Sequence, residues 1–237
     1  MSSSKEGAMA LDSWGYATPE TLEACQERTT QWKPALLELA KQVHKAMLHY
    51  KPDLQSKLTV QWYISDGSLL GAFRSGKMIS HDYDFDYGLC FLTEDGCVAD
   101  LETSKKGLPA IANYLSESLD KKYTILPRDD VAFKIEVYQE SSGIHWDNKG
   151  QWYNVHMDLQ MCFSPDQTKY VYAYFRDDYN DYIDIQVPDV LPLSEIEFES
   201  TKWPCPRNPE KYLIGVYGYI GTPAKYNSVT RKYEPLN

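Results

Sequence analysis

The sequence predicts a mixed α/β fold, and two kinds of pattern support this prediction. Apolar residues recur at helical spacing between residues 36 and 47 and again in residues 109–121. Alternating or continuous apolar runs bounded by turn-forming residues, as in residues 60–65 and 84–92, are typical of β-strands. Strand-like runs dominate the second half, so we expect a β-rich C-terminal part behind an N-terminal helical extension.

The N-terminal elements follow from their start signals. Residues 1–17 are mostly small and polar and are expected to form a flexible leader. Thr18 precedes a proline at the first helical position and is the expected cap of helices over residues 18–50, where Pro34 should kink the helix or divide it in two. A chain of 237 residues fits one core, so residues 18–237 are expected to form a single domain.

The remaining elements alternate between helices and strands and then become mainly strands. Turns are expected at Ser142-Gly143 and at Ser164-Pro165-Asp166. The expected elements are helices over residues 69–74, 109–121 and 210–217, and strands over residues 60–65, 84–92, 123–126, 132–139, 151–163, 170–175 and 183–187.

Composition and charge exclude several function classes. The formal net charge is −10 and no cluster of lysine and arginine is present, so we expect no nucleic-acid partner. No apolar run reaches the about 18 residues of a membrane span. The five cysteines include no C-x-x-C pair, which argues against a zinc cluster or a disulfide framework. The N-terminus lacks a secretory pattern, so a cytoplasmic protein is expected.

Three aspartates at alternate positions are the main candidate for chemistry. Asp82, Asp84 and Asp86 would project to one side of a strand. Such carboxylates repel one another unless a cation lies among them, and oxygen ligands suit Mg²⁺ or Mn²⁺. The alternative is a solvated edge strand or an acidic loop. The pattern therefore predicts a divalent-metal site but does not by itself exclude a charged surface.

The preceding segment has the character of an anion site. Gly67 and Ser68 follow a strand and precede a helix, so their backbone N–H groups would face an anion at the helix N-terminus. Arg74 could reach a phosphate group with two hydrogen bonds. An ordinary strand-to-helix connection is the alternative interpretation of this turn.

Together the two segments read Gly-Ser-Leu-Leu-Gly-Ala-x-Arg-x-Gly-x-x-Ile-x-x-Asp-x-Asp-x-Asp over residues 67–86. This pattern resembles the LicD and fukutin family of the nucleotidyltransferase superfamily. The resemblance implies a nucleotidyltransferase-like core sheet with flanking helices, in which Asp84 and Asp86 hold the metal. It also implies a carboxylate on a later strand, which Asp158 supplies, as a ligand of a second metal or as a general base. Asp82 would orient the site from outside it.

The same resemblance suggests which residues meet a nucleotide donor. Gly67, Ser68, Gly71 and Arg74 would lie at its phosphates. Lys134 would also contact donor phosphate, or would instead be a cross-strand partner for Glu136. Two histidines, His81 and His156, stand close to the proposed metal acids, although a packed or solvated position is the ordinary role of such residues.

The expected function is therefore a metal-dependent transfer with Mg²⁺ or Mn²⁺. A phospho-alcohol group, phosphocholine or a phosphopolyol, would pass from a cytidine-diphosphate-linked (CDP-linked) donor to a hydroxyl of a sugar or glycan acceptor. One alternative is transfer of a nucleoside monophosphate from a triphosphate to a small molecule or protein. Another is a non-catalytic binding protein that retains the fold.

Overall fold

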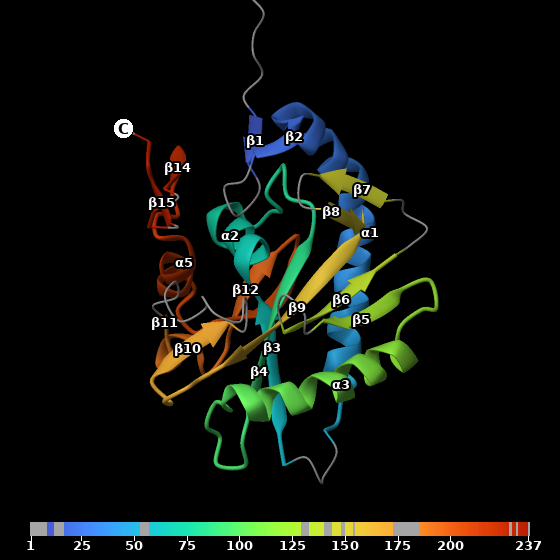
Figure 1. Ribbon diagram of the computed structural model, residues 1–237, viewed down its shortest axis with the longest axis vertical. Helices are drawn as coiled ribbons and strands as arrows, with labels where there is room; N and C mark the ends of the chain where they lie inside the picture. The colour runs from blue at the N-terminus through green and yellow to red at the C-terminus, as the bar shows by residue number, and fades with distance from the viewer. Residues whose placement is uncertain are drawn as a thin grey trace, which may run out of the picture.

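The computed structural model describes residues 9–11, 17–52, 57–128, 133–139, 144–147, 150–153, 155–172, 185–227, 229–230 and 232–236. A seven-stranded sheet forms its centre, with the order β11-β10-β9-β4-β3 and with β6 joining β9 and β5 joining β6 (Figure 1). β4 and β9 are parallel, and the other neighbours in this sheet are antiparallel. The strands are β3 (Thr59–Ile64), β4 (Phe85–Leu92), β5 (Thr124–Arg128), β6 (Lys134–Tyr138), β9 (His156–Phe163), β10 (Lys169–Tyr172) and β11 (Ile185–Gln186).

Helices and two-stranded hairpins surround this sheet, which confirms the mixed α/β prediction. The helices are α1 (Leu22–His49), α2 (Asp66–Ser75), α3 (Leu101–Ser118), α4 (Val187–Val190) and α5 (Pro209–Tyr217). The hairpins are β1 (Met9–Leu11) with β2 (Ala17–Thr21), β7 (Ile144–Asp147) with β8 (Gly150–Tyr153), β12 (Ser194–Phe198) with β13 (Thr201–Cys205), and β14 (Ala224–Asn227) with β15 (Lys232–Pro235).

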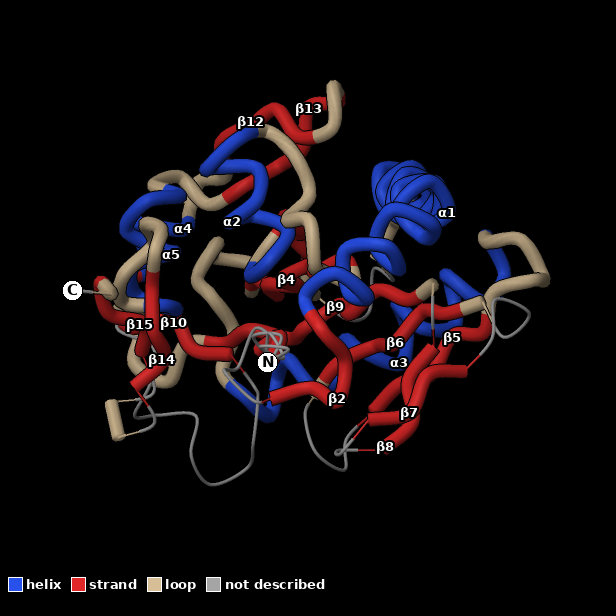
Figure 2. The backbone as a smooth tube through the Cα atoms, turned by 90° about the horizontal axis from the view of Figure 1, so that it is seen from above, coloured by secondary structure: helices blue, strands red, loops and turns tan. Residues whose placement is uncertain are grey.

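One face of the sheet is apolar and carries the core. Phe85 and Tyr87 alternate along β4 on this face and pack against Trp203 of β13. Trp203 also contacts His44 of α1, so the hairpin and α1 cover the same side of the sheet, as Figure 2 shows with α1 seen nearly end-on. α3 approaches the same face so closely that a Cβ on Gly107 would lie 2.2 Å from the Phe91 ring.

The opposite face is polar at its centre, and strand register explains why. Asp86 of β4 pairs with Asp158 of β9, and Asp158 pairs with Glu136 of β6. Residues paired across neighbouring strands point to the same side, so the three carboxylates form a row. Part of this face is covered by α5, whose Tyr212 ring lies 5.9 Å from the ring of Tyr63.

Two helices differ from the sequence-based expectation. α1 begins at Leu22 rather than at a Thr18 cap, and it continues through Pro34 without division. Pro34 and Thr30, the residue whose carbonyl loses its helical partner, are both exposed, so water can replace the lost bond. α3 begins at Leu101 because the Asp100 carboxylate caps the Thr103 amide at 2.7 Å, which places Pro109 inside the helix.

The expected strand over residues 151–163 is two strands, since β8 pairs with β7 while β9 enters the central sheet. β1 lies within the proposed leader, whose residues 1–8 and 12–16 are outside the described residues, as are residues 132, 142–143, 173–175 and 183–184 of other expected elements. Among the described residues, none of the helices combines the length and the apolar character that a membrane crossing requires.

Candidate active site

The candidate site begins where β3 ends and α2 starts. The Ser65 amide donates to the Asp86 carbonyl at 3.0 Å, which holds the end of β3 against β4. Asp66 then adopts a φ of +43°, in the left-handed region that aspartate tolerates better than most residues. Gly76, with a φ of +67°, ends α2 in the usual left-handed cap. Only Ser65 separates the end of β3 from the first residue of α2, so the helix N-terminus lies at the end of the strand.

The first turn of α2 faces the acidic segment. The Asp86 amide donates to Ser68 Oγ at 3.0 Å, which ties the helix start to β4. A Cβ on Gly67 would lie 2.6 Å from Asp82 Oδ2. Glycine is therefore required here by the close approach of the Asp82 carboxylate, and the positive end of the helix dipole lies beside the acids.

The three aspartates of the motif do converge, although only Asp86 lies within a strand. Asp82 and Asp84 precede β4, and the Tyr83 amide donates to Asp82 Oδ1 at 3.2 Å. The Asp82 and Asp84 carboxyls lie close enough for each to shift the pKa of the other. Thr29 of α1 donates a hydrogen bond to the Asp82 carbonyl, so the long helix holds this segment in place.

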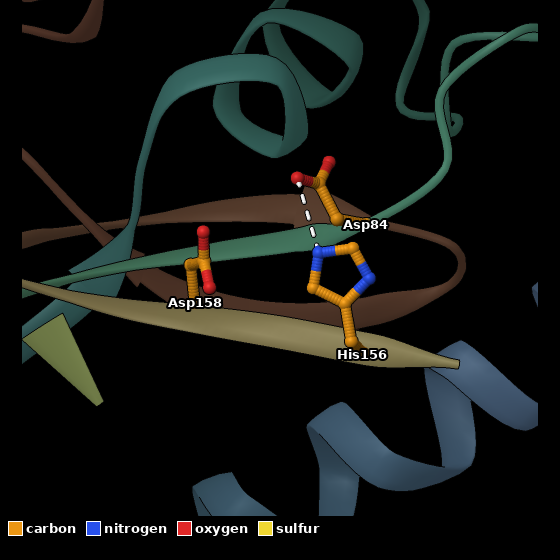
Figure 3. A group of neighbouring side chains, drawn as sticks. All are labelled: Asp84, His156 and Asp158. Atoms are coloured by element: carbon orange, nitrogen blue, oxygen red, sulfur yellow. Dashed lines mark ion pairs between the residues drawn. The ribbon is translucent and has the colours of Figure 1, made fainter. Parts of the chain in front are cut away.

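β9 brings two further side chains to the same place. Asp84, His156 and Asp158 each offer a ligand atom, and these atoms all lie within 4.8 Å of one another. Figure 3 shows His156 and Asp158 rising from β9 and Asp84 approaching from the segment before β4. His156 Nε2 lies 3.7 Å from Asp84 Oδ2. Asp86 stands beside this group and accepts a hydrogen bond from Gln160 Nε2 at 3.4 Å.

Burial and mutual repulsion make the carboxylates unusually basic. Burial, with the Asp84 and Asp158 carboxylates as further causes, raises the pKa of Asp66 to about 7. Burial and the neighbouring Asp84 carboxylate raise the pKa values of Asp82 and Asp86 well above the ordinary value. Burial also raises the pKa of Asp84, although the nearby His156 opposes the rise. The site carries more negative charge than its own side chains balance.

The residues present fit a divalent cation. Within the described residues, Asp66 Oδ2, Asp82 Oδ2 and Asp158 Oδ1 are buried and receive no hydrogen bond. Buried carboxylate oxygens without a donor are costly. A hard cation among them would remove that cost, and oxygen ligands favour Mg²⁺ or Mn²⁺. The imidazole of His156 adds a nitrogen that suits Mn²⁺ better than Mg²⁺.

The proposed donor-binding residues lie in different settings. Gly67 and Ser68 are at the acids, as described above. Gly71 packs against the following loop, because a Cβ there would lie 2.6 Å from the Lys77 carbonyl. Arg74 donates to the carbonyls of Ile220 and Gly221 at 2.8 and 3.1 Å. These bonds hold the C-terminal segment against α2, and the phosphate contact of Arg74 remains a prediction.

Lys134 lies at the site and has two carboxylate partners. Its Nζ is 2.7 Å from Asp158 Oδ2 and 3.0 Å from Glu136 Oε1. The pairing with Glu136 is therefore present, but it lies within strand β6 and not across two strands as expected, whereas Asp158 is the cross-strand partner of Lys134. Burial disfavours the charged form, yet Asp158 and Glu136 hold the pKa of Lys134 above its ordinary value.

Asp66 is the site residue that sequence reasoning missed. Its signal was a charged residue at the end of the apolar β3 run, directly before the Gly67-Ser68 turn. His156 was noted only as a neighbour of Asp158; because the two are separated by one residue on β9, they share a face of the strand. That spacing was visible in the sequence, but its pairing with Asp84 was not.

Residues 59–208 match the family described as LicD/FKTN/FKRP, nucleotidyltransferase domain. The matched span contains α2, the acidic segment and β9, and so includes every residue of the group formed by Asp84, His156 and Asp158. The search of curated proteins returned no match. The family match covers more than half of the chain, and the protein therefore belongs to the LicD/FKTN/FKRP family.

Proposed function

We propose that this protein is a metal-dependent transferase for a phospho-alcohol group. Phosphocholine or a phosphopolyol would pass from a CDP-linked donor to a hydroxyl of a sugar or glycan acceptor. The observation that carries the proposal is the convergence of buried carboxylates, three of them with oxygens that receive no hydrogen bond among the described residues, at the N-terminus of α2. Family membership supplies the reaction class, a phospho-alcohol or nucleotidyl type of transfer.

Different residues of the chain would bind the cation and the donor. Asp84, Asp86 and Asp158 hold Mg²⁺ or Mn²⁺. When bound, such an ion neutralises carboxylates and donor phosphate oxygens together. The amides of Gly67 and Ser68, at the positive end of α2, and the Lys134 ammonium would bind donor phosphate.

The reaction would form one bond and break one. The acceptor oxygen bonds to the phosphorus that carries the alcohol, and the phosphoanhydride bond to cytidine monophosphate breaks. The hydroxyl proton passes to a carboxylate base, a role open to Asp158 if it is not a metal ligand. The pKa of the neighbouring Asp66, raised to about 7 mainly by burial, shows that a carboxyl in this site can hold a proton near neutral pH.

The direct test is product release from CDP-linked donors. The protein is incubated with Mn²⁺, CDP-choline or a CDP-polyol, and a panel of sugars, and nucleotides are separated by chromatography. We expect cytidine monophosphate from the wild type, its loss on chelation, and a decrease of at least about 100-fold in Asp84→Asn. Glu117→Gln, an exposed change on α3, is the matched control and should retain full activity.

Other outcomes would support the alternatives. Pyrophosphate release from a nucleoside triphosphate, without cleavage of CDP-linked donors, would identify a nucleotidyltransferase that uses the same acids. Calorimetry that detects no Mg²⁺ or Mn²⁺ binding to the wild type, and no change on Asp84→Asn, would contradict both enzymes and favour a non-catalytic binding protein.

A further inference from the structure

Lys134 forms an ion pair with one carboxylate oxygen of Asp158, a proposed metal ligand. Its ammonium lies 2.7 Å from Asp158 Oδ2, while Asp158 Oδ1 is buried and receives no hydrogen bond within the described part of the chain. The Lys134 and Asp158 side chains are only 18% and 11% exposed, so water screens their attraction weakly. In this arrangement one carboxylate has a protein cation on one oxygen and an open position on the other.

Lys134 also has a second partner that is outside the metal group. Glu136 Oε1 lies 3.0 Å from Lys134 Nζ, and Glu136 Oε2 lies 3.3 Å from Nη1 of Arg128. Glu136 is the register partner of Asp158 across β6 and β9, so both carboxylates lie within reach of one ammonium. Lys134 can therefore leave Asp158 without becoming an unpaired buried charge.

We infer that Lys134 is a built-in counter-ion of Asp158 that holds this carboxylate in the metal-free protein and yields it when the divalent cation binds. The inference rests on the metal site of the proposed function. A monovalent ammonium and a divalent ion compete for the same carboxylate, so the strength of the Lys134 contact sets how tightly the metal binds. Once released, the ammonium stays on Glu136 and faces the site, where it can meet donor phosphate.

This role makes Lys134 a positioning residue with an unusual mutational signature. Removing its charge should strengthen metal binding, because Asp158 loses its competing partner. The same change should weaken the metal-free fold, because Asp158 then becomes a buried carboxylate without a cation. A purely structural lysine would lower stability without tightening the metal, and a lysine that serves only the donor would change neither.

The experiment measures Mn²⁺ affinity by calorimetry and metal-free melting temperature for the wild type and Lys134→Met. We expect Lys134→Met to bind Mn²⁺ about tenfold more tightly, since a close opposite charge typically shifts carboxylate equilibria by about one to three powers of ten. Its metal-free melting temperature should fall, and the rise on adding Mn²⁺ should exceed that of the wild type. Lys134→Arg keeps a cation beside Asp158 and should stay within about threefold of wild-type affinity.

Two further variants test whether the effect of Lys134 acts through its contact with Asp158 or follows from the loss of any nearby positive charge. Arg128→Met removes the same charge from the same hairpin but leaves the Lys134–Asp158 contact, so its Mn²⁺ affinity should change less than about threefold. In an Asp158→Asn background, Lys134→Met should no longer tighten Mn²⁺ binding, because the effect acts through Asp158.

Failure of the inference is distinguishable from failure of the proposed function. If the wild type binds Mn²⁺ and Lys134→Met binds it equally or more weakly, the counter-ion role is wrong while the metal site stands. Equal tightening by Lys134→Met and Arg128→Met would also overturn the role, since it would show only a general charge effect. Absence of Mn²⁺ binding in the wild type would overturn both.

Discussion

His156 places one imidazole among the carboxylates of the candidate metal group. Its imidazole lies 3.7 Å from Asp84 and shares with Asp84 and Asp158 the group whose ligand atoms lie within 4.8 Å. Carboxylate oxygens serve Mg²⁺ and Mn²⁺ alike, whereas an imidazole nitrogen contributes more to Mn²⁺. The residue can therefore act as a ligand or can orient Asp84, and the two roles predict different metal preferences.

We expect His156→Ala to weaken Mn²⁺ binding about tenfold and Mg²⁺ binding much less, because the lost ligand is a nitrogen. Competition between the two ions in calorimetry measures this difference. His49→Ala, at the exposed end of α1, is the control. Equal weakening of both ions would show that His156 orients Asp84 and does not ligate the metal.

Gly67 shows a second residue-scale constraint, the contact between the α2 backbone and the Asp82 carboxylate. Gly67→Ala would place a Cβ 2.6 Å from Asp82 Oδ2, and we expect a loss of about 1–3 kcal/mol in the free energy of unfolding. Chemical denaturation measures it. The double variant Gly67→Ala with Asp82→Ala should recover part of the loss, because the colliding carboxylate is gone. Strictly additive effects would contradict the collision.

At the scale of elements, α1 links the helical extension to the site. Its C-terminal half packs on the apolar face of the sheet through residues such as Val43 and Met47. Its N-terminal half reaches the acidic segment, where Thr29 donates to the Asp82 carbonyl and Arg28 stacks on Tyr83. The helix thus joins the core to the loop that carries two of the acids.

Thr29→Val should test this link, because valine keeps the shape and removes the donor. We expect a loss of about 1–2 kcal/mol in the free energy of unfolding and several-fold weaker Mn²⁺ binding, since the Asp82 carbonyl loses its partner. Thr30→Val is the matched control, as the exposed Thr30 hydroxyl bonds within the helix to the Gln26 carbonyl. If both variants bind Mn²⁺ equally, α1 does not support the site.

The elements themselves were predictable where one local signal dominated. The apolar run before Gly67 predicted β3, and the helix at residues 210–217 was confirmed as α5. The predicted start of α3 at Pro109 was wrong. The helix begins earlier, at Leu101, where the Asp100 carboxylate caps the Thr103 amide, and Pro109 lies inside it. The β12–β13 hairpin was missed because its turn is made by Glu199 and Ser200, which adopt positive φ although neither is a glycine or an asparagine.

The site residues, too, were predictable where a local sequence signal marked them. The motif brought Asp84 and Asp86 to attention, and the later strand supplied Asp158. The positive φ of Asp66 and the approach of His156 to Asp84 depend on how the strands pair. The sequence alone does not reveal that pairing or its register. Sequence reasoning therefore found Asp84 and Asp86 from the motif and Asp158 from the family resemblance, and it missed Asp66 and the position of His156 beside Asp84.

At the scale of the molecule, ionisation of the buried carboxyls in the acidic site lowers the free energy of unfolding. The folded pKa of Asp66 is raised to about 7, and those of Asp82, Asp84 and Asp86 are raised as well. Above an ordinary carboxyl pKa of 3.8 the folded state therefore binds more protons than the unfolded state. Stability must fall as pH rises through the folded pKa values.

We expect the metal-free protein to melt at a lower temperature at pH 8.5 than at pH 7, because Asp66, with a folded pKa of about 7, loses its remaining proton there at a cost of at most about 0.7 kcal/mol per pH unit. This interval avoids the histidines, whose ordinary pKa is about 6.5. Saturating Mg²⁺ should flatten the dependence, because the cation favours the ionised carboxylates. Asp66→Asn should reduce the slope, and a metal-free melting temperature that rises with pH would contradict this account.

The parallel pairing of β4 with β9 determines when during synthesis the proposed metal site can form. Asp86 and Gln160, which meet across this pair, stand 74 positions apart in the chain. A nascent chain that ends before β9 carries the acidic motif without Asp158 and His156, and it lacks the strand that positions them. Metal should therefore bind only after β9 has emerged and docked. Once the site is formed, a bound ion would stabilise the fold by RT ln(1 + c/Kd), where c is the concentration of the free ion.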